Sequence, residues 1–219
     1  MSKSVKRYSQ TSPLSENLRL FLRTLDLVLL LTYLLLNAKV KRRNLFNSHY
    51  VELGPGPAKL RAIKSMLFLK VLYIDKYDYG DSRDCLLLDI AESGIPQPRE
   101  LLGPHSVASD HLYFSDHCLE HLPYDQIVKF FSEYHGSFVF RFPNTRSMLG
   151  RLDFQSDDSH VTPFTDDQLQ LLNHLSKECT GIPISLLFWD RLYSTPPHRS
   201  LLSRNRAETS REVCIYRLV

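Results

Sequence analysis

The sequence predicts an α/β fold with a mostly parallel, seven-stranded sheet, helices on both faces and a helical extension at the amino terminus. Three observations support this prediction. Short apolar runs alternate with helical stretches from residue 45 onwards, as expected when helices join parallel strands. A glycine turn follows the first apolar run, and an acidic residue ends the second. A leucine-rich segment precedes this region.

The individual elements follow from hydrophobic periodicity and from the turn residues between the runs. Apolar runs predict strands 49–53, 71–75, 85–89, 110–115, 137–142, 184–192 and 212–218. Helical stretches are expected at 57–68, 97–102, 123–134 and 165–178. The last two strands are expected to form an antiparallel pair at the edge of the sheet. Residues 145–163 are expected to be a loop, and the Pro-, Ser- and Arg-rich stretch 193–211 a long mobile excursion.

Composition indicates one globular domain with an added segment, divided here into 1–44 and 45–219. With 219 residues, of which 43% are hydrophobic, the chain can bury a core of its own. The four cysteines form no C-x-x-C pair, so neither a disulfide framework nor a zinc ribbon is indicated, and we expect a reducing, cytoplasmic location. A net charge of +3 without a dense basic stripe argues against a nucleic-acid partner.

The leucine-rich segment has two interpretations. Its uncharged run extends only from Val28 to Ala38, shorter than the ~20 residues that span a bilayer. A signal peptide is disfavoured because the run starts far from the terminus and lacks a clear cleavage site. We expect a helix over about 15–41 that packs on the domain or across a homodimer. The alternative is a peripheral membrane contact through residues 15–43, with leucines in lipid and the basic cluster 39–43 at the headgroups.

The glycine turn predicts a ligand that lies against the backbone. Gly54 and Gly56 follow the first strand, and glycine allows both positive φ and close approach of a ligand. Asp75 ends the second strand, about 20 residues later, where a carboxylate binds a ribose diol in such units. The two features together indicate a nucleoside ligand.

Residues around the turn favour S-adenosylmethionine over a dinucleotide. A dinucleotide fingerprint has Gly or Ala where this chain has Lys59, and Pro57 removes an amide donor that a pyrophosphate would use. The carboxylate of Glu52 would repel a pyrophosphate, whereas it suits a ligand that carries an ammonium and a sulfonium.

At this point the sequence resembles the class I S-adenosylmethionine-dependent methyltransferases, in particular their small-molecule branch. Residues 52–58 (ELGPGPA) look like the first motif of that family, with Ala58 replacing the third glycine. Residues 110–121 resemble the form D-x-x-x-x-S-x-x-x-L-E-H at the fourth strand and its exit. Residues 137–144 resemble the fifth strand, and residues 160–172 resemble the helix before strand six. The matches cover about residues 45–192 in the family's order.

The resemblance implies a Rossmann-like fold and methyl transfer from S-adenosylmethionine to a small-molecule acceptor such as a sugar or a lipid-linked compound. It implies that the cofactor-binding residues lie at the ends of the first four strands. These residues are Glu52, Gly54, Gly56, Asp75, Asp89, Ile90 and Ser115. Of these, Asp89 and the amide of Ile90 would contact the adenine edge, although an acid such as Asp89 also suits a helix cap. The Asn-Pro-Pro-Tyr type of motif found in many nucleic-acid amino-group methylators is absent, which again argues against a nucleic-acid substrate.

Four polar residues are the candidates for the acceptor site, because each lies beyond a strand's carboxyl end or in the loop that covers it. They are His117, His121, Asn144 and His160. A neutral imidazole can take the proton of an acceptor hydroxyl at neutral pH, so His121 or His160 is the expected general base. We expect no metal ligand among the site residues.

Two alternatives remain open. The run from His117 to His121 also fits H-x-x-E-H, a zinc-peptidase pattern in which Glu120 would activate water and Glu133 would be the nearest third ligand. Pro123 argues against it, because a long zinc-binding helix would be cut short there. The second alternative is a catalytically silent scaffold or binding protein of the same fold, which the missing third glycine and the proline in the turn would permit.

Overall fold

One seven-stranded sheet forms the centre of the protein. The computed structural model describes residues 18, 21–22, 25–26, 29–30, 33, 49–55, 71–77, 85–108, 111–189 and 206–219. The strand order is β3-β2-β1-β4-β5-β7-β6. The strands are β1 (His49–Leu53), β2 (Val71–Asp75), β3 (Cys85–Leu87), β4 (His111–Asp116), β5 (Ser137–Pro143), β6 (Ser185–Trp189) and β7 (Glu212–Arg217). Only β7 runs against its neighbours β5 and β6, which confirms the predicted mostly parallel sheet and its antiparallel edge pair.

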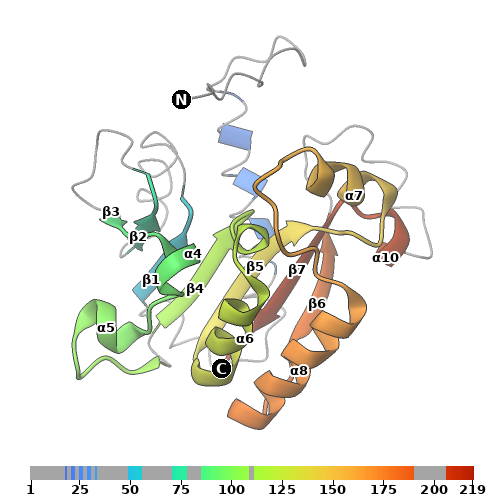
Figure 1. The fold of residues 1–219 in the computed structure, drawn as a ribbon. Coiled ribbons are helices and arrows are strands. Elements are labelled where there is room, and N and C mark those ends of the chain that lie inside the picture. Colours follow the sequence, from blue (N-terminus) through green and yellow to red (C-terminus); the bar gives the residue numbers. More distant parts are fainter. Residues whose placement is uncertain are drawn as a thin grey trace.

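The helices lie around this sheet (Figure 1). They are α4 (Ile90–Ser93), α5 (Pro98–Leu102), the 3₁₀ helix η2 (Leu119–His121), α6 (Tyr124–Glu133), α7 (Met148–Gln155), α8 (Asp166–Thr180) and α10 (Arg206–Thr209). In Figure 1, α6 and α8 cover the front of the sheet, whereas the amino-terminal helical residues lie behind it. Helices therefore cover both faces, as predicted. The helix expected over 57–68, the residue Asp110 and most of the excursion 193–211 lie outside the described residues.

Short helices replace the end of one expected strand and part of one expected loop. The third strand ends at Leu87 rather than at 89, because the Asp89 side chain caps α4 by accepting a hydrogen bond from the Ala91 amide at 3.0 Å. The stretch 145–163, expected as a loop, contains α7. Its cap, Ser147, accepts from the Gly150 amide at 3.0 Å, and a Cβ at position 150 would lie 2.1 Å from the Asn144 carbonyl oxygen. Glycine at position 150 therefore allows the first turn of α7 to pack directly against the backbone of Asn144.

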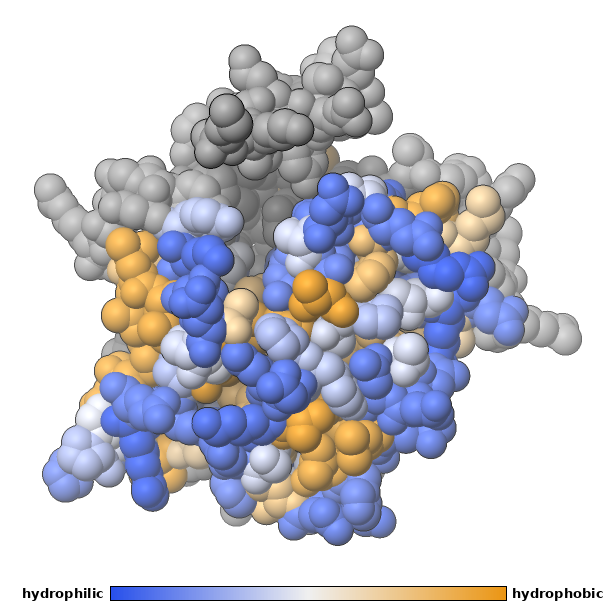
Figure 2. Space-filling view, in the orientation of Figure 1, coloured by the Kyte–Doolittle hydropathy of each residue, from blue (hydrophilic) through white to orange (hydrophobic). Residues whose placement is uncertain are grey.

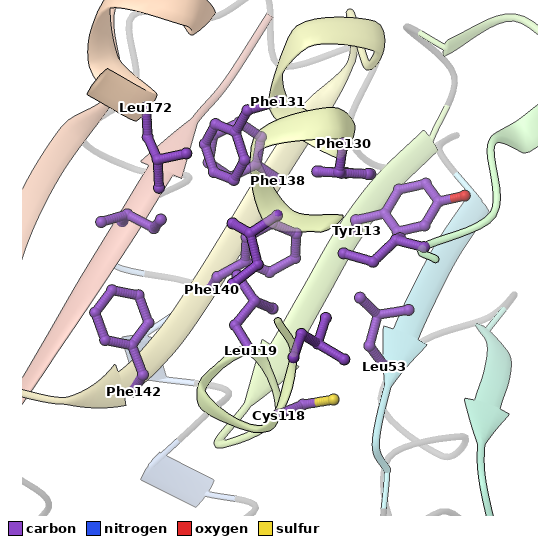
Figure 3. Packing of buried hydrophobic residues seen from close by; sticks show 14 of the residues in the cluster. Leu53, Tyr113, Cys118, Leu119, Phe130, Phe131, Phe138, Phe140, Phe142 and Leu172 are labelled. Atoms are coloured by element: carbon purple, nitrogen blue, oxygen red, sulfur yellow. The ribbon is translucent and has the colours of Figure 1, made fainter. Parts of the chain in front are cut away.

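Aromatic residues fill the core between the sheet and helices α6 and α8 (Figure 3). The rings of Phe138 and Phe140 on β5 stack with centroids 5.1 Å apart, and Phe131 of α6 meets Phe138 edge-on at 4.8 Å. Such pairs contribute about 0.5–1.5 kcal/mol beyond the burial of their surface. The strand aromatics belong to this core, since Tyr113 and Phe140 are completely buried.

The amino-terminal helix covers the second face of the sheet. Its residues Asp26 and Leu30 are buried, and Leu30 belongs to a hydrophobic cluster with residues of β1, β4, β5 and β7. Leu18, Phe21, Leu25, Leu29 and Tyr33, by contrast, are exposed. Within the described residues the segment is therefore a helix that packs on the domain, as expected, while both expected helix ends lie outside them. None of the helices that the structure describes is long and apolar enough to span a membrane.

A buried charge cluster joins this helix to the sheet. Arg141 of β5 forms an ion pair with Asp26, donates from Nε to Asp116 Oδ1 at 2.9 Å and lies 3.5 Å from Glu212 Oε2. Trp189 of β6 donates from Nε1 to Asp26 Oδ1 at 3.1 Å. Burial would lower the pKa of Arg141, but the surrounding carboxylates more than offset this effect and raise it well above its ordinary value. The guanidinium is therefore a permanent positive charge in the protein interior.

Strand β3 ends the sheet on a hydrophobic edge. Leu86 and Leu87 of this strand are exposed. Figure 2 shows the corresponding hydrophobic surface at the left of the molecule. Because β3 is at the opposite end of the sheet from β6 and β7, this edge lies far in the strand order from the buried charge cluster.

Replacing Arg141 with methionine is expected to lower the free energy of unfolding by about 3–5 kcal/mol, because it leaves buried carboxylates without their cation. Urea unfolding followed by circular dichroism measures this loss. The control is Arg146→Met, which breaks the ion pair with Asp166, whose side chain is 57% exposed, and should cost less than ~1 kcal/mol. Equal losses in the two variants would contradict the assigned role of Arg141.

Candidate functional site

The candidate site lies where the strand order reverses direction. From β1 the chain continues to β2 on one side, whereas from β4 it continues to β5 on the other side. Strands β1 and β4 are parallel neighbours, with Leu53 opposite Ser115 near their carboxyl ends. Ligands of open α/β sheets bind in the crevice at such a switch point. The end of β1, the end of β4 and the segments that follow them therefore form the site.

The turn after β1 requires glycine at its first position. Gly54 has φ of +63°, and its amide donates to the Ile74 carbonyl of β2 at 2.9 Å. A Cβ at this position would lie 3.0 Å from Cys118 Sγ, in the segment that follows β4. The glycine at position 54 therefore also makes room for the Cys118 side chain, besides the ligand that the sequence predicts there. Gly56 lies outside the described residues.

Cys118 lies just beyond β4 (Figure 3), where the charges of three carboxylates act on its thiol. Burial raises the pKa of the Cys118 thiol, and the negative charges of Glu120, Asp75 and Glu52 raise it further. Glu52 and Asp75 are themselves buried. Two acids that the sequence predicted for the cofactor, and a third, Glu120, that the sequence analysis gave no role at the cofactor, thus act on the same thiol.

Asp75 and Asp89 are held in different ways. The Tyr77 amide donates to Asp75 Oδ1 at 3.1 Å, which orients this carboxylate at the end of β2. Asp89 caps α4 and has its second oxygen 2.5 Å from Lys76 Nζ. The hydrogen bond from Lys76 is the main cause that lowers the pKa of Asp89 below its ordinary value. Asp89 thus has the helix-cap role; the adenine contact expected of Asp89 and the Ile90 amide stays a prediction.

Ser115 is a buried polar residue at the end of β4. Its side chain is almost fully inaccessible to solvent. Within the described part of the chain, its Oγ has no hydrogen-bond partner. A buried hydroxyl without a partner costs about 1–3 kcal/mol, so its position beside the switch point fits a bound polar ligand.

His117 faces the protein interior. Its φ is +60°, which is uncommon for a residue other than glycine, and its ring lies between two buried glutamates. Nδ1 is 2.9 Å from Glu120 Oε1, and Nε2 is 2.9 Å from Glu212 Oε1. His117 therefore connects the Arg141 cluster to Glu120. These contacts support a structural role, and the predicted contact with the acceptor stays a prediction.

His121 and His160 come together, as expected for an acceptor site. Their ring centroids are 4.6 Å apart, and His160 Nε2 lies 3.8 Å from Glu120 Oε1. The backbone holds the two segments in register, because the Glu120 carbonyl accepts from the amides of Val161 at 2.8 Å and Thr162 at 3.0 Å. Sequence reasoning missed the contact of Glu120 with His160, because it joins segments 40 positions apart.

Asn144 has a structural role in the described contacts. Its Nδ2 donates to the carbonyls of Ala207 at 2.8 Å and Ser210 at 2.7 Å, while Oδ1 accepts from the Arg146 amide at 3.2 Å. The side chain thus holds the segment before β7 against the end of β5. The expected place of Asn144 at the acceptor is not supported by these contacts.

The zinc-peptidase alternative is wrong in its geometry. That pattern needs two histidines one turn apart on one α-helix. Here His117 precedes the helix with a positive φ, and His121 ends the short 3₁₀ helix η2. Glu133, the expected third ligand, ends α6. The three residues whose ligand atoms do lie within 4.8 Å of one another are Glu120, His121 and His160.

Comparisons with known proteins identify the fold. No family model matches the sequence, and no curated protein matches it. A solved structure of an S-adenosylmethionine-dependent methyltransferase from Archaeoglobus fulgidus aligns over 89% of this chain and 93% of its own, with a TM-score of 0.57 and 14% identity. The methyltransferase domain of bacterial CtHen1-C aligns over 90% and 98%, with a TM-score of 0.51 and 12% identity. The chain therefore has the class I methyltransferase fold, while the branch within it stays a prediction.

Replacing Gly54 with alanine tests the turn. Any residue with a Cβ pays about 1–2 kcal/mol for the left-handed conformation, and at position 54 it also meets Cys118. The control is Gly181→Ala, because Gly181 has φ of +75° and an added Cβ there would have no atom within 4 Å. Thermal unfolding should show a larger loss for Gly54→Ala than for Gly181→Ala. Similar losses would contradict the close approach to Cys118.

Proposed function

We propose that the protein transfers a methyl group from S-adenosylmethionine to a small-molecule acceptor. The observation that carries the proposal is the position of the buried carboxylates of Glu52 and Asp75 at the carboxyl ends of β1 and β2, beside the Gly54 turn and Cys118 at the switch point. A carboxylate at the end of the second strand suits a ribose diol. Further carboxylates suit a ligand that carries an ammonium and a sulfonium. The shared fold is consistent with this chemistry.

Four residues would hold the cofactor in this proposal. Asp75 would accept hydrogen bonds from the ribose, and Glu52 would lie near the methionine ammonium, directly or through a water. The Gly54 turn leaves the backbone open to the ligand, and the Ser115 hydroxyl, which has no partner among the described residues, would find one there. When bound, S-adenosylmethionine supplies a methyl group already activated by its sulfonium sulfur.

The chain then has to align the acceptor, exclude water and, for a hydroxyl acceptor, remove a proton. His160 is suited to this place, because its Nδ1 lies 2.8 Å from the Phe154 carbonyl oxygen and therefore donates, which leaves the Nε2 lone pair directed at the site. His121 lies beside it. In the simplest form of the proposal, one of these two imidazoles takes the acceptor's proton.

Helix α7 suggests an acceptor with an apolar part. Met148 is 68% exposed, and Leu149 and Leu152 on the same helix are also exposed. The helix reaches the site, because Phe154 stacks on His160 with ring centroids 5.2 Å apart. Figure 2 shows hydrophobic colour over α7 at the upper right. These side chains support a lipid-linked or otherwise amphiphilic acceptor over a bare sugar.

Calorimetric titration with S-adenosylmethionine and S-adenosylhomocysteine tests the cofactor assignment. Asp75→Ala should weaken binding at least ~10-fold, since hydrogen bonds to a charged group contribute about 1.5–3 kcal/mol. The control is Asp125→Ala, which removes an exposed carboxylate on α6 and should leave binding unchanged. No binding by the wild-type protein would refute the proposal. Tight binding without turnover on any amphiphilic acceptor would favour the scaffold alternative.

We also propose that the exposed face of the amino-terminal helix rests on an anionic membrane. Phe21, Leu25 and Leu29 are exposed on the helix that carries the buried Asp26. The basic cluster 39–43 follows in the sequence, and such clusters bind anionic headgroups. A membrane location would bring an amphiphilic acceptor to the chain.

Co-sedimentation with phosphatidylserine-containing vesicles tests this contact. Deleting residues 1–43 would remove Asp26 and Leu30 from the core, so the sharper variant is Phe21→Ser, Leu25→Ser and Leu29→Ser together. It should lose most vesicle binding, and wild-type binding should weaken as salt is raised. The control replaces Leu86, Leu87 and Leu102, exposed at the other edge, with serine. If the helix variant bound vesicles as well as the wild-type protein does, the proposed membrane contact would be wrong. A dimer in sedimentation analysis would indicate that this helix face binds a second copy of the chain.

A further inference from the structure

We propose that Glu120, His121 and His160 bind a divalent transition-metal cation of the Zn²⁺ type. One ligand atom from each residue lies within 4.8 Å of the other two. The residues come from two segments, η2 and the loop after α7, which backbone hydrogen bonds hold together. The cluster lies directly after β4, beside the acids that we assign to the cofactor.

The hydrogen bonds of His160 leave one ring nitrogen available as a ligand. Its Nδ1 lies 2.8 Å from the Phe154 carbonyl oxygen, which can only accept, so Nδ1 carries the hydrogen. In the neutral ring Nε2 then has a lone pair, and it faces Glu120 Oε1 at 3.8 Å. A lone pair directed at a carboxylate is unfavourable unless a proton or a metal cation lies between them. Metal-binding histidines usually donate their other ring N–H to a carbonyl or carboxylate, as His160 does here.

In His121, too, Nδ1 donates a hydrogen bond and Nε2 is left with the lone pair; here the acceptor belongs to Ser159. The Ser159 hydroxyl donates to Asp157 Oδ1, and its oxygen lies 3.0 Å from His121 Nδ1. The Ser159 carbonyl oxygen, which can only accept, lies 3.3 Å from the same nitrogen. Nδ1 is therefore the donor, and Nε2 keeps its lone pair. Both histidines thus present the same ring nitrogen with the same protonation.

Glu120 supplies the anionic ligand. The residue is completely buried. Neither of its carboxylate oxygens has a hydrogen-bond partner among the described residues, although Oε1 lies 2.9 Å from His117 Nδ1. A buried carboxylate oxygen without a partner is costly, and a bound cation would remove that cost. His117 Nδ1 lies close to Oε1 from the side of Glu212, so the imidazole also limits where this carboxylate can lie.

The ligand set indicates the class of metal. Two imidazoles and one carboxylate suit Zn²⁺, Co²⁺ or Fe²⁺, whereas Mg²⁺ and Ca²⁺ prefer oxygen ligands. Bonds of about 2.0–2.2 Å place tetrahedral ligand atoms roughly 3.4 Å apart, so rotation of the half-exposed His121 ring is enough to close the site. Three protein ligands leave a position open, as in catalytic rather than structural zinc sites.

This open position suggests a role, which rests on the proposed function. An acceptor hydroxyl bound there would have a lowered pKa and would release its proton to solvent. The alkoxide would then form a bond to the methyl carbon as the bond from that carbon to the sulfonium sulfur breaks, which leaves S-adenosylhomocysteine. The two histidines would then be ligands rather than bases. The same lone pairs cannot serve in both ways at once.

Titration of the full-length, metal-free protein with Co²⁺ tests the site without any methyl acceptor. One equivalent should bind with the visible absorption of four-coordinate Co²⁺, and Zn²⁺ should displace it. Glu120→Gln and His160→Ala should each weaken binding at least ~10-fold, the range found when ligands or their supports are removed. The control His174→Ala removes an exposed histidine next to Glu178 and should bind like the wild-type protein.

Several results would overturn the site. They are no stoichiometric binding by the wild-type protein, unchanged binding in Glu120→Gln and His160→Ala, or loss of binding in His174→Ala. If a buried variant fails to fold, His121→Gln on the half-exposed ring gives the same comparison. Titration of the metal-free protein with S-adenosylhomocysteine separates the two proposals. Cofactor binding without Co²⁺ binding leaves the histidines as general bases, whereas Co²⁺ binding without cofactor binding overturns the methyltransferase proposal alone.

Discussion

The interaction on which the rest of the structure depends is the burial of the Arg141 guanidinium among carboxylates. Asp26 comes from the amino-terminal helix, Asp116 from the end of β4 and Glu212 from the start of β7. No one of these elements can move without exposing or unpairing a charge in the interior. The arginine therefore couples the helix on one face of the sheet to the strand ends at which the candidate site lies.

This cluster continues into the site through a single histidine. Glu212 contacts His117, and His117 contacts Glu120, so a chain of charges runs from the back of the sheet to the Glu120, His121 and His160 group. Buried ion pairs stabilise little compared with apolar residues of similar volume, but they penalise every arrangement that separates them. We therefore infer that these charge contacts fix the position of Glu120 and contribute little to the stability of the fold.

Much of the fold and about half of the site were predictable from sequence. The strands are short apolar runs whose ends can be recognised locally. Glu52, Asp75 and Ser115 could therefore be placed correctly near the carboxyl ends of β1, β2 and β4. His117 and Asn144 occupied equally suggestive positions. Their partners, Glu212 for the first and Ser210 for the second, lie far away in the sequence, so nothing local revealed that these side chains are engaged.

The sequence by itself determined which segments form strands, the glycine turn and the acids at the strand ends, because apolar periodicity and backbone requirements are local properties of the chain. Only the tertiary structure decided which charges are buried together, that residues 148–155 form a helix, and that Glu120 meets His160 rather than forming part of a zinc-peptidase helix. These outcomes depend on contacts between residues distant in sequence, where desolvation makes the pairing of each polar group decisive.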